Sequence, residues 1–120
     1  IPKEVWVNTS EAEIQIAFSP VYEITKRLIG ELVSLKKSNL LMEKRNSFII
    51  KKLILGPFKS KLNTQGIMSP EFVARKIIQK AENDSYLIIV TPNPITYLLM
   101  PFAESIRILY SRLIKKIYSN

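Results

Sequence analysis

The 120-residue sequence contains no cysteine and no histidine. Without cysteine there is no disulfide framework and no thiolate metal site, and without histidine the commonest general base and metal ligand is missing. Ser-His-Asp, Cys-His and histidine-ligated zinc mechanisms are therefore excluded within this chain, and acid–base chemistry would fall to Tyr, Lys, Asp or Glu. The chain has only three glycines, far apart, and so lacks a phosphate-cradling glycine-rich loop.

The charge that is present is mostly positive: 18 Lys and Arg against 10 Asp and Glu give a net charge of +8. Such a balance indicates a polyanion, an anionic membrane surface or a phosphate-bearing cofactor as partner. We interpret the basic residues of the middle of the chain as a solvated surface, and they disfavour a nucleic-acid partner because aromatic residues are not interleaved with them. These residues are Lys36, Lys37, Lys44, Arg45, Lys51, Lys52, Lys59 and Lys61.

The pattern along the chain alternates between strand and helix. Short apolar runs predict strands at 4–7, 48–55 and 86–90, and Ser-Pro pairs predict helices beginning at Ser19 and Ser69. A third helical segment follows from 94 to 118, and Pro101 is expected to divide it. This order predicts an α/β fold with a parallel sheet and helices against it. Within the predicted helices, apolar residues repeat at helical spacing. They are Ile24, Leu28, Leu32 and Leu35 in the first helix, and Phe102, Ile106, Leu109, Leu113 and Ile117 in the last.

Tyr22 and Lys26 stand four residues apart near the start of the first helix, so both side chains lie on one helical face. A neighbouring ammonium stabilises a phenolate, and the pair can therefore donate and accept a proton without histidine. The preceding strand ends in Asn8-Thr9-Ser10, at the edge of a parallel sheet where active sites are found. The hydroxyl of Ser10 or of Thr9 could orient a carbonyl substrate there.

These motifs together resemble the second half of the short-chain dehydrogenase/reductase family. The resemblance rests on Val7-Asn8-Thr9-Ser10, Tyr22-x-x-x-Lys26, Leu55-Gly56-Pro57-Phe58-Lys59-Ser60 and Ser69-Pro70-Glu71-Phe72-Val73-Ala74. It implies the C-terminal portion of a Rossmann-like doubly wound sheet over residues 1–92, followed by an apolar and basic helical tail at 93–120. The reductase part of a sterol desaturase/short-chain dehydrogenase fusion is one form of this family that the chain resembles.

The resemblance implies roles for individual residues. Tyr22, Lys26 and Ser10 would be catalytic, and Lys26 with Gly56, Pro57, Phe58 and Ser60 would bind the nicotinamide end of NAD or NADP. The activity implied is NAD(P)-dependent redox chemistry on a small or lipid-like carbonyl substrate. The sequence departs from the family pattern at Leu55, where proline is usual, and at Ser60, where threonine is usual. The spacing of Ser10 is also one residue short.

The family's phosphate-binding turn and its acidic or basic cofactor-sorting residue have no counterpart in this chain, which begins with Ile1 and shows no signal peptide. We therefore expect a cytoplasmic fragment that needs an N-terminal cofactor-binding half. The alternative is a degenerate, non-catalytic fragment that serves as a membrane-surface or oligomerisation module. The basic tail could pack on the sheet, on a partner subunit of a homo-oligomer, or lie on an anionic membrane.

Overall fold

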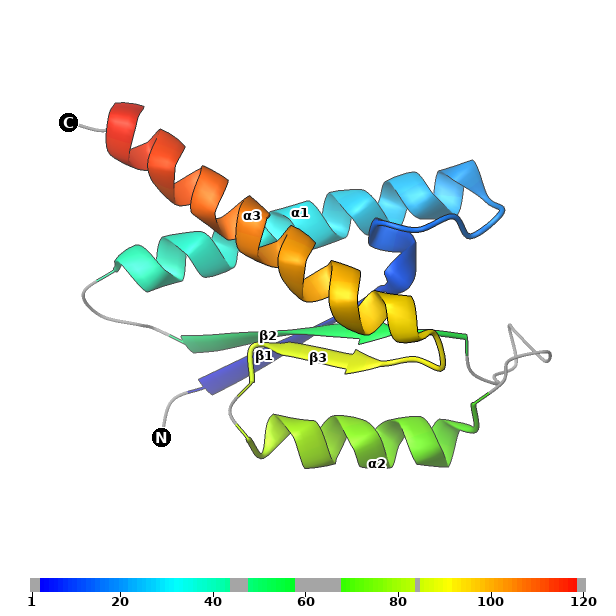
Figure 1. Cartoon of the computed structure of the whole chain (residues 1–120). Helices are drawn as coiled ribbons and strands as arrows, with labels where there is room; N and C mark the ends of the chain where they lie inside the picture. Colours follow the sequence, from blue (N-terminus) through cyan, green and yellow to red (C-terminus); the bar gives the residue numbers. More distant parts are fainter. Residues whose placement is uncertain (1–2, 44–47, 58–67, 84, 119–120) are drawn as a thin grey trace.

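The computed structural model describes residues 3–43, 48–57, 68–83 and 85–118, and shows an α/β fold built on a three-stranded parallel sheet. The strands β1 (Lys3–Ser10), β2 (Phe48–Leu55) and β3 (Leu87–Val90) lie in the order β1-β2-β3. Helices α1 (Pro20–Met42) and α3 (Pro94–Tyr118) cover one face of the sheet, and α2 (Pro70–Ala81) covers the other (Figure 1). The predicted α/β class is confirmed.

Both predicted helix starts are confirmed, and each has a local cause. The Ser19 hydroxyl accepts a hydrogen bond from the backbone N–H of Tyr22, and the Ser69 hydroxyl accepts one from Phe72. A proline follows each serine at the first helical position, where its missing N–H costs nothing. The Glu23 carboxylate also accepts from the N–H of Ser19, which fixes the turn that leads into α1.

The prediction that Pro101 divides the last helical segment is wrong, because α3 runs without a break from Pro94 to Tyr118. Pro101 lies in its second turn, so the helix loses one backbone hydrogen bond near its beginning and continues for four further turns. One turn further on, the Ser105 hydroxyl donates a hydrogen bond to the backbone carbonyl of Pro101 over 2.8 Å.

The face of the sheet under α2 is an ordinary apolar core. It consists of Leu53, Leu55, Met68, Val73, Ala81, Ile88 and Val90, all buried. The sequence of α2 predicts this contact through Val73 and Ala81, which the structure buries, whereas Ile78 on the same predicted face is 55% exposed.

The opposite face, under α1 and α3, combines two small apolar clusters, around Ile50 and Ile54, with a group of buried charges. Lys52 on β2 is completely buried, and its ammonium donates to Glu13 (3.3 Å), to Glu104 (2.7 Å) and to the Ser34 hydroxyl (2.9 Å). Arg107 of α3 adds a second cation, 2.7 Å from Glu13. Two carboxylates thus face two cations, so the buried cluster is electrically balanced. We call Lys52, Glu13, Glu104 and Arg107 the charge cluster.

Tyr86, the residue before β3, hydrogen-bonds to the charge cluster. Its hydroxyl donates to Glu104 over 2.6 Å. Burial, and then the negative charge of Glu104, raise the pKa of Tyr86 well above its usual value, so the phenol stays protonated. Lys37 of α1 stands over the Tyr86 ring, 5.0 Å from its centroid, and burial lowers the pKa of this lysine.

The prediction that the basic residues of the middle of the chain form a solvated surface is wrong for two of them. Lys51 and Lys52 do not belong to a solvated surface, since they are 2% and 0% exposed and are paired with carboxylates or carbonyl oxygens. The predicted apolar repeat of α1 lies on the exposed side of the helix, since Ile24, Leu28, Leu32 and Leu35 are 47–61% exposed. The buried residues of α1 are Gly30, Val33, Ser34, Ser38 and Leu40.

Candidate functional site

A cavity of about 770 Å³ opens at the carboxyl ends of β1 and β2, in the size range of small-molecule sites. The parallel register sets Ser10 beside Leu55, so the two strands end together and the loops that follow them form the walls. The cavity contains most of the residues that the sequence nominates. Its lining is Asn8, Thr9, Ser10, Glu11, Ala12, Ile16, Ala17, Phe18, Ser19, Tyr22, Lys26, Leu55, Gly56 and Pro57.

Tyr22 and Lys26 enter this cavity from the first two turns of α1. The Lys26 ammonium lies 5.6 Å from the centroid of the Tyr22 ring, close enough for a cation–π contact. The phenol is 44% exposed, so its hydroxyl is accessible to a ligand in the cavity. The structure therefore brings both predicted residues to one cavity.

The two hydroxyls at the end of β1 are used differently. Thr9 is 2% exposed, and its hydroxyl donates to the Glu13 carboxylate inside the fold. Ser10 lies at the rim of the cavity, where its oxygen accepts from the N–H of Ala12 and caps the short 3-10 helix η1 (Glu11–Glu13). Because that contact uses the oxygen as an acceptor, the Ser10 O–H can still donate to a ligand. Of the two, Ser10 is the better placed to orient a substrate.

Gly56 and Pro57 form the wall at the end of β2. The N–H of Gly56 continues the sheet by donating to the carbonyl of Val90 over 2.9 Å. A β-carbon at Gly56 would lie 2.3 Å from the Thr91 hydroxyl oxygen, so glycine is required here by close packing of the two strand ends. The predicted cofactor-binding residues Phe58 and Ser60 lie outside the described residues.

The loop between β1 and α1 supplies a residue that the sequence argument did not nominate. Phe18 lines the cavity, is 96% exposed, and adopts a left-handed backbone conformation with φ of 57°. Bulky residues rarely adopt this conformation, and it tends to occur at functional sites. The only signal in the sequence is the small apolar island at 14–18 within a polar loop.

The same loop is fastened to the far side of the sheet by polar side chains. The Glu11 carboxylate accepts from Thr91 (2.9 Å), at the end of β3, and from Thr96 (2.7 Å), in the first turn of α3. In the turn between β3 and α3, the side-chain amide of Asn93 donates to the side-chain oxygen of Gln15 over 2.8 Å. Together with Glu13 in the charge cluster, these contacts tie the cavity wall to α3.

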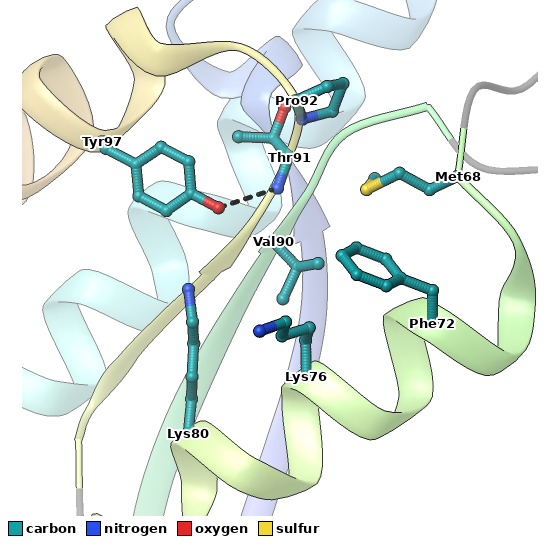
Figure 2. A pocket seen from close by; sticks show the side chains of 8 residues that line it. All are labelled: Met68, Phe72, Lys76, Lys80, Val90, Thr91, Pro92 and Tyr97. Carbon is teal, nitrogen blue, oxygen red and sulfur yellow. Dashed lines mark hydrogen bonds between the residues drawn. The ribbon is translucent and has the colours of Figure 1, made fainter.

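A second, smaller cavity of about 350 Å³ lies at the end of β3, between α2 and the start of α3 (Figure 2). Met68, Phe72 and Val90 form an apolar floor, while the Lys80 ammonium stands 4.9 Å from the centroid of the Tyr97 ring. The Tyr97 hydroxyl accepts the N–H of Thr91, so the aromatic ring is held at the rim. None of the residues that the sequence nominates lines this cavity.

Comparison with known proteins links the chain to an enzyme of glycolipids. It is 51% identical over 114 residues to the monoglucosyldiacylglycerol epimerase of Synechocystis sp., and the alignment covers 95% of this chain and 26% of the epimerase. The chain thus spans about a quarter of the length of this curated relative. No family model matches the chain, and no solved structure matches it.

This similarity corrects the family assignment made from the sequence. The chain is not the C-terminal half of a short-chain dehydrogenase/reductase, because the curated protein that matches nearly all of it is an epimerase. The prediction that the chain is an oxidoreductase of the short-chain dehydrogenase type is therefore wrong as well. The Tyr-x-x-x-Lys spacing and the Ser-Pro helix starts are local solutions to helix geometry and capping, and so they do not by themselves define a family. What the comparison supports is an enzymatic role.

Proposed function

We propose that this chain forms the substrate-binding and acid–base part of an enzyme that epimerises the sugar of a glycolipid, with monoglucosyldiacylglycerol as the substrate. The observation that carries the proposal is the cavity in which Ser10, Tyr22 and Lys26 meet at the strand ends. The 51% identity to a protein named monoglucosyldiacylglycerol epimerase supports the proposed reaction class and substrate.

Epimerisation at a sugar carbon inverts the configuration of a carbon that carries a hydroxyl group. The C–H bond there is not acidic, so inversion proceeds readily only if the hydroxyl is converted to a carbonyl and back. The Tyr22 oxygen would take the hydroxyl proton as the carbonyl forms and return it as the hydroxyl is restored. The Lys26 ammonium would stabilise the charged form of Tyr22, and Ser10 would donate a hydrogen bond to the reacting oxygen.

The described residues fit one end of the predicted nicotinamide cofactor. The Lys26 ammonium could hold ribose hydroxyls beside the Gly56–Pro57 wall, whereas a phosphate-cradling turn is absent from this sequence. When bound, NAD or NADP would reversibly oxidise the hydroxyl-bearing carbon, with no net oxidation over the cycle. Phe18, at the rim, offers an aromatic face against which the sugar ring could pack.

The test uses the complete gene product and a Tyr22→Phe variant. Monoglucosyldiacylglycerol is supplied in detergent micelles, and the sugar released from the lipid is identified by chromatography. Loss of a positioned acid–base group lowers turnover by about 10²–10⁴-fold, so Tyr22→Phe should reduce inversion at least 100-fold. Tyr118→Phe removes the same atom from a tyrosine that is 79% exposed at the far end of α3 and should leave the rate unchanged. An active Tyr22→Phe enzyme would refute the assigned role.

A non-catalytic module is the second candidate, favoured by the exposed apolar side chains of α1. Val21, Ile24, Leu28 and Leu32 are 56–76% exposed along one side of this helix, a pattern suited to contact with a second copy or another partner. Under this alternative the wild-type protein and Tyr22→Phe would both fail to invert the sugar while remaining folded.

A further inference from the structure

Helix α3 has its apolar side turned away from the protein. Seven large apolar residues repeat at spacings of three and four, and every one of them is 49–75% exposed. They are Ile95, Leu98, Phe102, Ile106, Leu109, Leu113 and Ile117, and we call them the outer stripe of α3. Packing of this stripe on the sheet, one of the arrangements expected from the sequence, is therefore wrong.

Beside the buried Met100, the inward side of the same helix carries polar side chains that bind the loop forming one wall of the candidate site. Thr96 is fully buried and donates to Glu11, Glu104 is 3% exposed and binds Lys52, and Arg107 binds Glu13. Helices of water-soluble proteins usually bury their apolar side and expose their polar side. In α3 the seven residues of the outer stripe are exposed and Met100 is the fully buried apolar residue of its inward side, so packing among the described residues does not explain the outer stripe.

The charges beside the outer stripe indicate what covers it. The acidic residue of α3, Glu104, is buried in the charge cluster, whereas Arg112, Lys115 and Lys116 are exposed. The exposed charges of α3 are therefore all positive. On α1, by contrast, the exposed Glu31 adds negative charge. A long apolar stripe with flanking cations is typical of helices that lie in the surface of an anionic bilayer.

None of the helices that the structure describes combines the length and hydropathy of a transmembrane span. We propose that α3 lies flat on an anionic lipid bilayer, with its outer stripe among the acyl chains and Arg112 and Lys116 at the phosphate groups. The choice of lipid as occupant rests partly on the proposed function, whose substrate is a diacylglycerol lipid. Because Glu11 and Glu13 tie the cavity wall to the inward side of α3, docking would also hold the site close to the headgroups.

The experiment measures membrane contact at single positions of the complete gene product. These 120 residues contain no cysteine, so one cysteine is introduced at Leu109, any cysteine elsewhere is replaced by serine, and a polarity-sensitive fluorophore is attached. The matched control is Gln79→Cys on α2, which is exposed on the opposite face of the sheet (Figure 1). Vesicles contain brominated phosphatidylcholine, with or without phosphatidylglycerol, because bromine quenches only fluorophores that enter the acyl region.

Docking predicts a blue shift and quenching at position 109 with phosphatidylglycerol vesicles, weaker effects without the anionic lipid, and no change at position 79. In a separate binding assay, Phe102→Ser with Leu109→Ser should weaken vesicle affinity at least about tenfold. A label at 109 that stays in water with vesicles present would overturn the proposal. So would a label that is shielded before vesicles are added, since a protein surface would then cover the stripe.

The activity assay in micelles separates this proposal from the proposed function. If the label enters the bilayer and the sugar is not inverted, docking stands and the epimerase proposal fails. If the sugar is inverted and the label stays in water, docking fails and the epimerase proposal stands. If both hold, the Phe102→Ser, Leu109→Ser variant should lose inversion of vesicle-embedded substrate and keep it in micelles.

Discussion

The two faces of the sheet are covered in opposite ways. Under α2, buried apolar side chains such as Leu53, Ile88 and Val90 meet the helix, and the buried Lys51 pairs with a carboxylate, Glu4, that is 41% exposed. Under α1 and α3, two buried carboxylates and two cations lie between two small apolar clusters, and most of the large apolar residues of both helices are exposed. Apolar packing tolerates small adjustments, whereas a buried charge needs its partner at one position. The charged face is thus suited to fix geometry, and it adjoins the candidate site.

The largest effect should follow from removing the central cation of the charged face. Lys52→Met removes one of the two cations that pair with the buried carboxylates of Glu13 and Glu104, which should cost about 3–5 kcal/mol of unfolding free energy. Urea denaturation gives this value. The control is Lys51→Met on the same strand, whose partner Glu4 is 41% exposed, so its cost should be clearly smaller. Equal costs would mean that the charge cluster has no special role.

A smaller effect should follow from truncating the apolar face. Ile88 is completely buried against α2, so Ile88→Ala removes buried surface and leaves a cavity, at a cost of about 2–4 kcal/mol. The same denaturation experiment measures it. The candidate site should be unaffected, since Ile88 does not line that cavity, and sugar inversion by the folded variant should therefore match the wild type. Reduced turnover in folded protein would show that the two faces are coupled.

The smallest of these effects concerns Tyr86 and depends on pH. Tyr86→Phe removes a hydrogen bond to Glu104, which should cost about 1–3 kcal/mol near neutral pH. Because the folded protein raises the pKa of Tyr86 above the unfolded value of about 10, this contribution is complete below pH 10 and declines above it. The stability difference between wild type and variant should therefore shrink in alkaline solution.

Denaturation curves from pH 7 to about pH 11.5 would measure this trend. Lys37 titrates with the opposite sign, since its lowered pKa makes deprotonation favour the folded state, but it does so in both proteins. Tyr118→Phe, at an exposed tyrosine, serves as the control. A stability difference that stays constant above pH 10 would contradict the assignment of a protonated, buried Tyr86.

The sequence predicted those features that depend on local chemistry. Serine and proline at 19–20 and 69–70 gave the helix starts, the alternation of elements gave the α/β class, and the strand ends brought Ser10 and Gly56 to one cavity. The sequence did not predict side-chain burial that depends on partners far away in the chain. Lys52 has the same side chain as a surface lysine, and only carboxylates 39 and 52 residues away in the chain explain its burial. Whether the resulting cavity is catalytic stays a prediction.

Gly30 has a consequence for how the protein folds. It sits in the middle of α1, where glycine weakens an isolated helix by about 1 kcal/mol relative to alanine. A β-carbon at this position would lie 1.8 Å from a Glu13 carboxylate oxygen, and the Gly30 carbonyl accepts from Lys52 over 2.9 Å. The first half of α1 carries Tyr22 and Lys26, and the contacts at Gly30 that join it to Glu13 and Lys52 are tertiary. We therefore expect Tyr22 and Lys26 to reach their final positions late in folding, together with the tertiary contacts around Gly30 rather than with the helix itself.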